Sequence, residues 1–143
     1  MTPEQKQKIE AVLSANDFGV IATNSDGGAP ESAVISISKT PEGKIVFCSS
    51  DTLRKNHNIV RDSRVSFVTG WDAVVRQTVQ IEGVARLLEG ADRDAVESVH
   101  CAIHKGFEKH NGNPHQQYFM IEPKWVRYSD LSVNLESWEI ALY

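Results

Sequence analysis

The hydrophobic positions near the N-terminus repeat with the period of a helix. Ile9, Val12 and Leu13 fall on one helical face, with polar residues between them. The preceding segment Thr2-Pro3-Glu4-Gln5 places a hydroxyl at the cap position, proline at the first helical position and glutamine three residues after the cap, which is the pattern of a capping box. These features predict an amphipathic helix over residues 3–15 that packs on the body of the protein.

Beyond this helix the hydrophobic period changes to that of strands. Ala33, Ile35 and Ile37, for example, alternate with serines, which is typical of a strand with one buried face. Turn-forming sequences such as Ser25-Asp26-Gly27-Gly28 separate the segments. The pattern predicts strands at residues 18–23, 31–38, 44–49, 64–69, 76–88, 117–122, 125–129 and 138–143.

Two further helices are expected between these strands. Asp51 or Thr52 provides an N-cap for a short helix that ends at Arg61. Residues 92–105 form the second helix, because apolar side chains recur there at helical spacing. Its apolar stripe consists of Val96, Val99 and Ile103.

The longest predicted strand, Arg76–Leu88, has thirteen residues, and Gly83 in its middle offers a place to bend. A strand of this length favours closure of the sheet. Residues 107–115 are expected to form a loop, and Pro123 is expected to break the strand that follows. Because the strands succeed one another without regular βαβ alternation, we expect an α+β fold, a small antiparallel barrel in a single domain over residues 1–143.

Composition narrows the class of protein. Of the 143 residues, 41% are hydrophobic and 24% are charged, as in an ordinary globular domain. Fifteen Lys and Arg against nineteen Asp and Glu give a net charge of −4, which disfavours nucleic acid as a partner. No run reaches the roughly 18 apolar residues of a membrane span. The two cysteines form no CxxC pair, and the N-terminus lacks a signal-type apolar core, so we expect a cytoplasmic protein without a membrane partner.

Positive charge is nevertheless concentrated in residues 39–64, which hold six basic residues against three acidic ones. Within this segment a strand is predicted to end at Cys48-Ser49-Ser50, and a helix begins with Arg54-Lys55. A helix N-terminus presents N–H groups to an anion, and hydroxyls and cations complete the set of donors. The segment favours a site for one terminal phosphate, with solvated helix charges as the alternative. Neither a P-loop nor a GxGxxG motif is present.

Several ordered motifs resemble those of a known family. They are Gly28-Ala29-Pro30, Val34-Ile35, Val46-Phe47-Cys48-Ser49, Arg54-Lys55, Trp71 followed by Arg76-Gln77, and Glu82-Gly83-Val84-Ala85-Arg86-Leu87. Over residues 18–90 the chain resembles the FMN-binding split barrel of pyridoxamine 5'-phosphate oxidases and their general-stress-protein-like relatives. The resemblance implies a small antiparallel split β-barrel with flanking helices, FMN as cofactor, and a homodimer with the cofactor at the subunit interface.

Position by position, the resemblance also implies a cofactor site. Arg54 and Lys55 would bind the FMN phosphate, and Cys48 and Ser49 would lie beside the ribityl phosphate. The backbone of residues 33–38 would run along the isoalloxazine ring. The residues expected at the ring from this strand are Ala33, Val34, Ile35 and Ser36.

A second group of candidates follows the fourth predicted strand. The resemblance implies that Gln77 or Thr78 meets the flavin from the partner subunit, and the spacing of Trp71 to Arg76-Gln77 adds Trp71 to this group. One residue more separates Gln77 from Gly83 than in the oxidases, which a bulge would explain. Which of the two side chains faces the flavin stays open.

The chain also departs from the oxidases. Ala33 and Ser38 stand where the oxidases carry an Arg and a Lys, and the C-terminal segment that recognises the pyridoxal substrate has no counterpart. We therefore expect an FMN-dependent oxidoreductase of unidentified substrate rather than a vitamin B6 oxidase, and we nominate no catalytic residue because the flavin carries the redox chemistry. The alternatives are a non-catalytic flavin-binding or stress-response protein, and a split barrel that binds deazaflavin or haem.

Five histidines raise the question of a metal site. His100 and His104 share a helical face at i and i+4, but the glutamate of an HExxH motif is absent. We therefore interpret these two as surface or interface histidines and expect no metal. His57 is interpreted as part of a solvated helix face, and the roles of His110 and His115 stay open.

Overall fold

The computed structural model describes residues 1–132 and 135–142. Along the chain its elements are α1 (Pro3–Ala15), β1 (Phe18–Asn24), β2 (Pro30–Lys39), β3 (Ile45–Ser50), α2 (Arg54–Arg61), β4 (Arg64–Gly70), β5 (Gln77–Leu88), α3 (Gly90–Ile103), the 3-10 helix η1 (Phe107–His110), β6 (Gln116–Asp130) and β7 (Glu136–Ala141). The Thr2 capping box predicted for α1 is present, and Ile9, Val12 and Leu13 are buried as expected.

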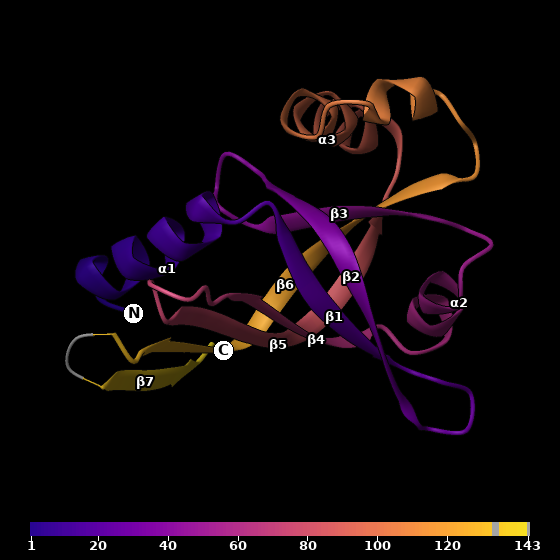
Figure 1. Ribbon diagram of the computed structural model, residues 1–143. Helices are drawn as coiled ribbons and strands as arrows, with labels where there is room; N and C mark the ends of the chain where they lie inside the picture. Colours follow the sequence, from indigo (N-terminus) through magenta and orange to yellow (C-terminus); the bar gives the residue numbers. More distant parts are fainter. Residues whose placement is uncertain (133–134, 143) are drawn as a thin grey trace.

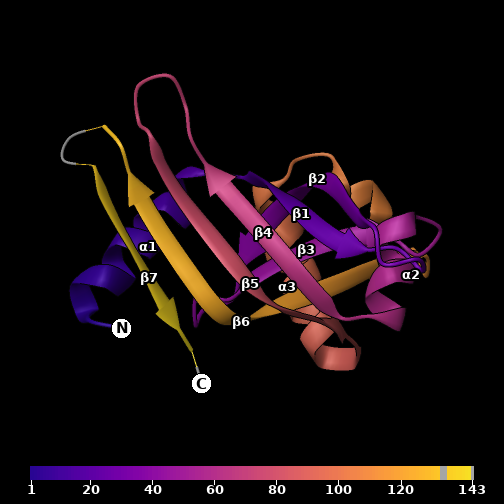
Figure 2. The ribbon, with the colours of Figure 1, turned by 90° about the horizontal axis from the view of Figure 1, so that it is seen from below.

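The strands form one antiparallel sheet that closes on itself. Their order is β3-β2-β1-β4-β5-β6-β7, and an additional pairing of β3 with β6 closes β1–β6 into a six-stranded barrel. Strand β6 makes this closure possible because it pairs with β5 along one edge while its first part pairs with β3 along the other. The last part of β6 pairs with β7. Figure 2 shows β7 lying outside the barrel along the end of β6. The α+β barrel predicted from the sequence is confirmed.

Alternating side chains of the strands fill the barrel. Phe47 and Phe119 stack at its centre with their ring centroids 5.2 Å apart, and both are fully buried. Around them lie the inward-facing aliphatic residues of the other strands, such as Ile21, Ile35 and Val79. This period-2 burial is what the sequence alternation predicted.

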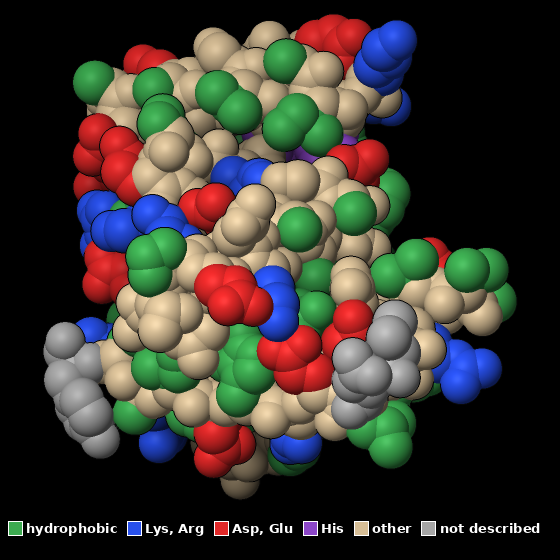
Figure 3. Space-filling view, turned by 90° about the vertical axis from the view of Figure 1, so that its left-hand side faces the viewer, with side chains coloured by type: hydrophobic (Ala, Val, Ile, Leu, Met, Phe, Trp, Pro, Cys, Tyr) green, Lys and Arg blue, Asp and Glu red, His purple; other side chains and the backbone are tan. Residues whose placement is uncertain are grey.

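The three helices cover different parts of the barrel. Helix α1 lies at one end and α2 at the other, while α3 crosses the outer face of β2 and β6 (Figure 1). None of the helices in the described part of the chain is both long and apolar enough to cross a membrane. The face that carries α1 and β7 intermixes acidic and basic side chains (Figure 3).

Strand β6 differs from the prediction. It runs unbroken through Pro123, which pairs with Gly83 at a bulge where Lys124 is the unpaired extra residue. A bulge accommodates proline because the ladder hydrogen bond is already interrupted there. A Cβ on Gly83 would lie 2.1 Å from the carbonyl oxygen of Glu122, so only glycine fits this close approach. The bulge lies on β6, since β5 pairs with β4 in continuous register, and it therefore does not explain the extra residue between Gln77 and Gly83.

Helix α2 begins later than predicted. Its N-cap is Leu53, and none of the described side chains caps it. Asp51 instead contacts His115, with 3.1 Å between a carboxylate oxygen and Nδ1, and the Thr52 hydroxyl bonds to that of Ser50 at 3.0 Å. Neither of the two predicted side chains therefore caps the helix.

Helix α3 turns a different face to the sheet than predicted. Val99 and Ile103 are 42% and 44% exposed, whereas His100 is fully buried and His104 is 7% exposed. Only Val96 of the predicted stripe packs against buried residues. The interpretation of the two histidines as surface or interface residues was therefore wrong, because both are buried within a single chain against the polar outer surface of β2.

Candidate functional site

A pocket of about 200 Å³ opens where α2 begins, at one end of the barrel. Its walls come from the facing parts of β1, β2 and the start of α2. They are formed by Thr23, Glu31, Ser32, Ala33, Leu53, Arg54 and Lys55. Three of the residues predicted for the cofactor, Ala33, Arg54 and Lys55, therefore share one pocket.

Arg54 enters this pocket as half of an ion pair. Its Nη1 lies 3.2 Å from Oε1 of Glu31, and the Arg54 side chain is 82% exposed. The other carboxylate oxygen of Glu31 accepts a hydrogen bond of 2.9 Å from Nδ2 of Asn58. Asn58 is buried and also donates to the Thr23 hydroxyl at 3.0 Å. The carboxylate is thus held from two sides, while the guanidinium remains free to move.

Lys55 lies half-buried beside Arg54 and near Cys48. Burial lowers the pKa of Lys55, and the proximity of Cys48 opposes this effect. Burial also raises the pKa of the Cys48 thiol, so the thiol stays protonated at neutral pH. Lys55 therefore lies near a neutral sulfur, and Cys48 is not an activated nucleophile.

A buried hydrogen-bond network continues from Cys48 under α3. The imidazole of His100 lies with Nε2 3.3 Å from Sγ of Cys48 and 3.2 Å from the Ser36 hydroxyl. Its Nδ1 lies 3.0 Å from the Ser38 hydroxyl. His104 bonds through Nε2 to the carbonyl oxygen of Ile37 at 2.7 Å. The serines on the outer face of β2 are therefore already engaged by α3.

Two buried polar atoms near the start of α2 have no hydrogen-bond partner among the described residues. They are Oγ of Ser49 and Oδ1 of Asn56. The amide nitrogen of Asn56 donates to the carbonyl oxygen of Ser49 at 3.2 Å and to Gln117 at 2.9 Å. A free buried hydroxyl at the strand end, two cations and a helix N-terminus are the donor set that a phosphate group accepts, so these residues fit a phosphorylated cofactor.

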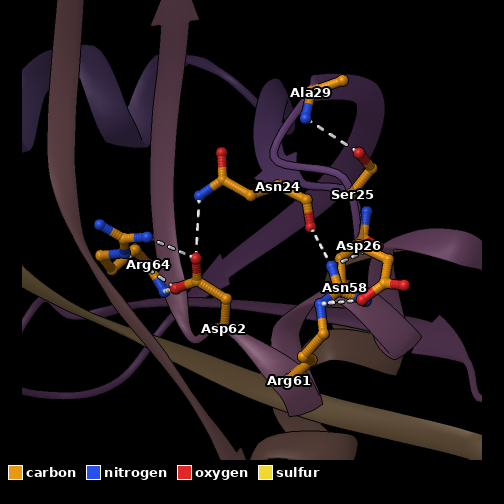
Figure 4. Close-up of polar contacts among 8 residues, drawn as sticks. All are labelled: Asn24, Ser25, Asp26, Ala29, Asn58, Arg61, Asp62 and Arg64. Carbon is orange, nitrogen blue, oxygen red and sulfur yellow. Dashed lines mark hydrogen bonds and ion pairs between the residues drawn. The ribbon is translucent and has the colours of Figure 1, made fainter.

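The far end of α2 is anchored to the β1–β2 hairpin (Figure 4). Arg61 pairs with Asp26 at 3.6 Å. Asp62 accepts hydrogen bonds from Arg64 and Asn24, and the Arg64 guanidinium holds the pKa of this carboxyl far below its usual range. These contacts lie on the opposite end of the helix from the pocket and fix its orientation.

The second group of predicted residues lies on the outer face of the barrel. Trp71, Thr78 and Val34 line a shallow hollow of about 420 Å³ together with Phe18 and other apolar residues. Val34 is 70% exposed and Trp71 is 55% exposed. Exposed apolar side chains that gather on one face in this way are typical of a protein–protein interface.

Gln77 lies outside this hollow. Its Nε2 donates to Oδ2 of Asp130 at 2.8 Å, while its backbone carbonyl accepts from the amide of Trp71 at 2.8 Å. Because successive residues of β5 point to opposite sides, Thr78 shares the outer face with Val34 and Gln77 does not. Ile35 points into the core and is 3% exposed, so only its backbone can border a ligand.

Three residues in and around this site received no role from the sequence: Glu31, Asn58 and His100. Glu31 carried a signal, because the alternation of β2 extends to it and places a charged residue on the core-facing side of the strand. Asn58 and His100 carried none, since their partners come from distant strands. In the described part of the chain, His, Cys, Asp and Glu side chains form no group of three that could hold a metal ion.

The chain matches a known protein family over most of its length. The family model described as pyridoxamine 5'-phosphate oxidase matches residues 5–130 of the chain. None of the curated proteins matches the chain significantly.

Solved structures share the fold at low sequence identity. A haem-binding protein from Mycobacterium smegmatis superposes with a TM-score of 0.84 at 18% identity, covering 99% of this chain but only 59% of its own. General Stress Protein 26 from Bacillus anthracis gives 0.77 at 16% identity, covering 97% of this chain and 99% of its own. A putative pyridoxamine 5'-phosphate oxidase from Listeria innocua gives 0.71 at 20% identity, covering 90% and 98%.

Proposed function

Since this chain belongs to the pyridoxamine 5'-phosphate oxidase family, we propose that it binds FMN and acts as an oxidoreductase on a substrate still to be identified. The observation that carries the proposal is the pocket at the start of α2, where Arg54 and Lys55 stand together beside β2. FMN, when bound, supplies the redox chemistry, and the protein contributes position and electrostatics.

The phosphate end of the cofactor is assigned to this pocket. Arg54 and Lys55 provide two cations, and the first turn of α2 provides backbone N–H groups. The buried Ser49 hydroxyl, which has no hydrogen-bond partner among the described residues, lies on β3 shortly before α2, although Ser49 is not one of the residues that line the pocket. Cys48 is a neutral, buried side chain that lies near Lys55 but outside the set of residues that line the pocket. A terminal phosphate matches this donor set better than an uncharged ligand would.

The flavin ring is assigned to the outer edge of β2. Ala33 lines the pocket, Val34 next to it belongs to the exposed apolar face, and the backbone of Ile35 follows. Ser36 lies beyond them, where its hydroxyl contacts His100 of α3. We propose a homodimer in which the partner's copy of this face covers the ring. Trp71 and Thr78 are the residues of the second group that such a partner would present, because they lie on the same outer face as Val34.

The absorption spectrum of the purified protein tests the cofactor. A yellow protein that releases FMN on denaturation, or a colourless one that takes up FMN with low-micromolar affinity, supports the proposal. A colourless protein that refuses FMN at high micromolar concentration contradicts it. Anaerobic mixing of the yellow protein with NADH or NADPH then separates an oxidoreductase from a non-catalytic flavin-binding protein. Only in an oxidoreductase should the nicotinamide reduce the flavin, and so remove its yellow absorbance, at a rate consistent with turnover.

Haem is the second candidate ligand, because the Mycobacterium smegmatis protein that superposes with this chain is named as haem-binding. In this chain His100 and His104 are buried and their ring nitrogens contact Ser36, Ser38, Cys48 and the Ile37 carbonyl. An iron ligand would therefore have to come from elsewhere. Titration with haemin followed by its Soret band, alongside titration with FMN and a deazaflavin, ranks the three ligands directly.

A further inference from the structure

Glu31 is a carboxylate at the wall of a pocket whose other charges are positive. It precedes Ala33 on the core-facing side of β2, at the mouth of the barrel, and its side chain is 21% exposed. The resemblance to the oxidases assigns it no role, and its charge is opposite to that of the residues that suit an anion. Its position therefore calls for a physical explanation.

The two partners of Glu31 hold it with unequal firmness. Asn58, which is 5% exposed and itself tied to Thr23, donates to Oε2 at 2.9 Å. Arg54 contacts Oε1 at 3.2 Å from a side chain that is 82% exposed. Ion pairs with an exposed partner are weak, because solvent screens them and the long side chain loses freedom. Arg54 is consequently the partner that can leave, while Glu31 stays.

A phosphate group in this pocket would need Arg54 and would meet Glu31 at the same wall. Phosphate offers more acceptor oxygens and more negative charge than one carboxylate, so it competes successfully for the guanidinium. The negative charge of Glu31 nevertheless stays near the bound anion, and like charges a few ångströms apart repel even with partial screening. Both effects lower the affinity of the pocket for a phosphorylated ligand.

We propose that Glu31 is an internal competitor for the phosphate site. It occupies Arg54 while the pocket is free of ligand and opposes the bound phosphate afterwards, which makes binding of a phosphorylated ligand weaker and more readily reversed than the Arg54-Lys55 pair alone would make it. This inference rests on the proposed function, because it concerns the pocket to which we assign the FMN phosphate.

The test compares wild-type protein with Glu31→Gln in titrations with FMN and with riboflavin, which lacks the phosphate. Glutamine keeps an oxygen that accepts from Asn58 and removes only the charge. We expect FMN to bind about tenfold more tightly to the variant and riboflavin to bind with unchanged affinity. Asp26→Asn is the matched control: it removes the same charge from the same hairpin, but Asp26 pairs with Arg61 at the far end of α2 (Figure 4).

Glu31→Ala provides a second variant, which should tighten FMN binding in the same direction, and circular dichroism melting verifies that both variants fold. Unchanged or weaker FMN binding in Glu31→Gln, or an equal gain in Asp26→Asn, overturns the inference. Calorimetric titration with inorganic phosphate separates the two proposals. If FMN fails to bind but Glu31→Gln binds phosphate more tightly than wild type, the inference stands and FMN as the ligand is wrong. If neither ligand binds either protein, both proposals fall.

Discussion

The imidazole of His100 lies with Nε2 3.3 Å from Sγ of Cys48, and this contact joins α3 to β3 in the interior of the protein. His100 is fully buried, and its other nitrogen bonds to Ser38 of β2. Tyr118 of β6 packs edge-on against the same ring, with the centroids 5.8 Å apart. One neutral imidazole thus connects the helix to three strands.

This arrangement predicts that stability falls in mildly acidic solution. Burial, followed by the charge of His104, lowers the pKa of His100 from 6.5 to about 4. Below pH 6.5 the unfolded chain binds a proton that the folded protein accepts only near pH 4, so stability present at neutral pH is lost as the pH falls between these values. The loss should reach about 2 kcal/mol, measured as the free energy of unfolding in urea at pH 7.5 and pH 4.5.

His100→Gln separates this effect from general acid destabilisation. Glutamine keeps hydrogen-bonding groups but has no proton to gain, so the variant should be less stable at pH 7.5 and should lose less stability on acidification than wild type. His57→Gln, which replaces an exposed histidine of α2, should keep the full wild-type dependence. An equal loss in His100→Gln and wild type would show that His100 does not cause it.

Much of the fold was predictable because it depends on local pattern. The capping box of Thr2 and Gln5, the alternation around Ile35 and the turn glycines specify α1 and the first hairpin without reference to distant residues. Closure of the barrel also followed, since the length of β5 exceeds what a flat sheet needs. The Arg54-Lys55 pair was predictable for the same reason, as it combines a strand end with a helix start.

The features that escaped prediction depend on partners far along the chain. His100 resembles a surface residue by its type, and its burial becomes favourable through the hydroxyls of Ser36 and Ser38 and the thiol of Cys48, all more than 50 positions earlier. Pro123 looks like a strand breaker until Gly83 is placed opposite it. Glu31 resembles a solvated charge in the sequence, but in the fold it contacts Asn58 and Arg54 of α2. In each case tertiary contacts override the local preference.

Replacing both Arg54 and Lys55 with alanine should weaken FMN binding by several kcal/mol. Each charge-assisted hydrogen bond to a phosphate is worth about 1.5 to 3 kcal/mol, and the effect should shrink as salt concentration rises. Fluorescence titration of FMN measures the change. Replacing Lys105 and Lys109, two exposed lysines after α3, is the matched control for lost charge and should leave the affinity close to wild type. Equal affinities for FMN in the two double variants would show that the phosphate binds elsewhere than at Arg54 and Lys55.

Gly83→Ala should destabilise the protein by about 2 kcal/mol or more. The added Cβ would lie 2.1 Å from the carbonyl oxygen of Glu122, and backbone at a bulge between paired strands cannot move away without breaking the ladder. Gly27→Ala is the control, because a Cβ there meets nothing within 4 Å and should change stability by less than about 0.5 kcal/mol. Urea denaturation measures the free energy of unfolding of both variants. Similar values for the two would contradict the close approach of Gly83 to Glu122.

Val34→Asp should disrupt the proposed homodimer. Val34 is 70% exposed and pairs across strands with Val20, which pairs with Val68 in turn, so a row of valines crosses the outer face. The free energy needed to remove a carboxylate from water into such a face is far larger than the free energy that the apolar contact contributes. Light scattering of the eluting protein should report a dimer for wild type and a single 15.9 kDa chain for the variant.

The same variant links assembly to the cofactor. If the partner subunit covers the flavin ring, Val34→Asp should also weaken FMN binding, although Val34 lies outside the phosphate pocket. Val60→Asp is the matched control, since Val60 is 74% exposed on α2 and lies on a different element. It should remain dimeric and bind FMN like wild type. A monomeric wild type that binds FMN tightly would show that one subunit completes the site, and dissociation of Val60→Asp would place the interface on α2 instead.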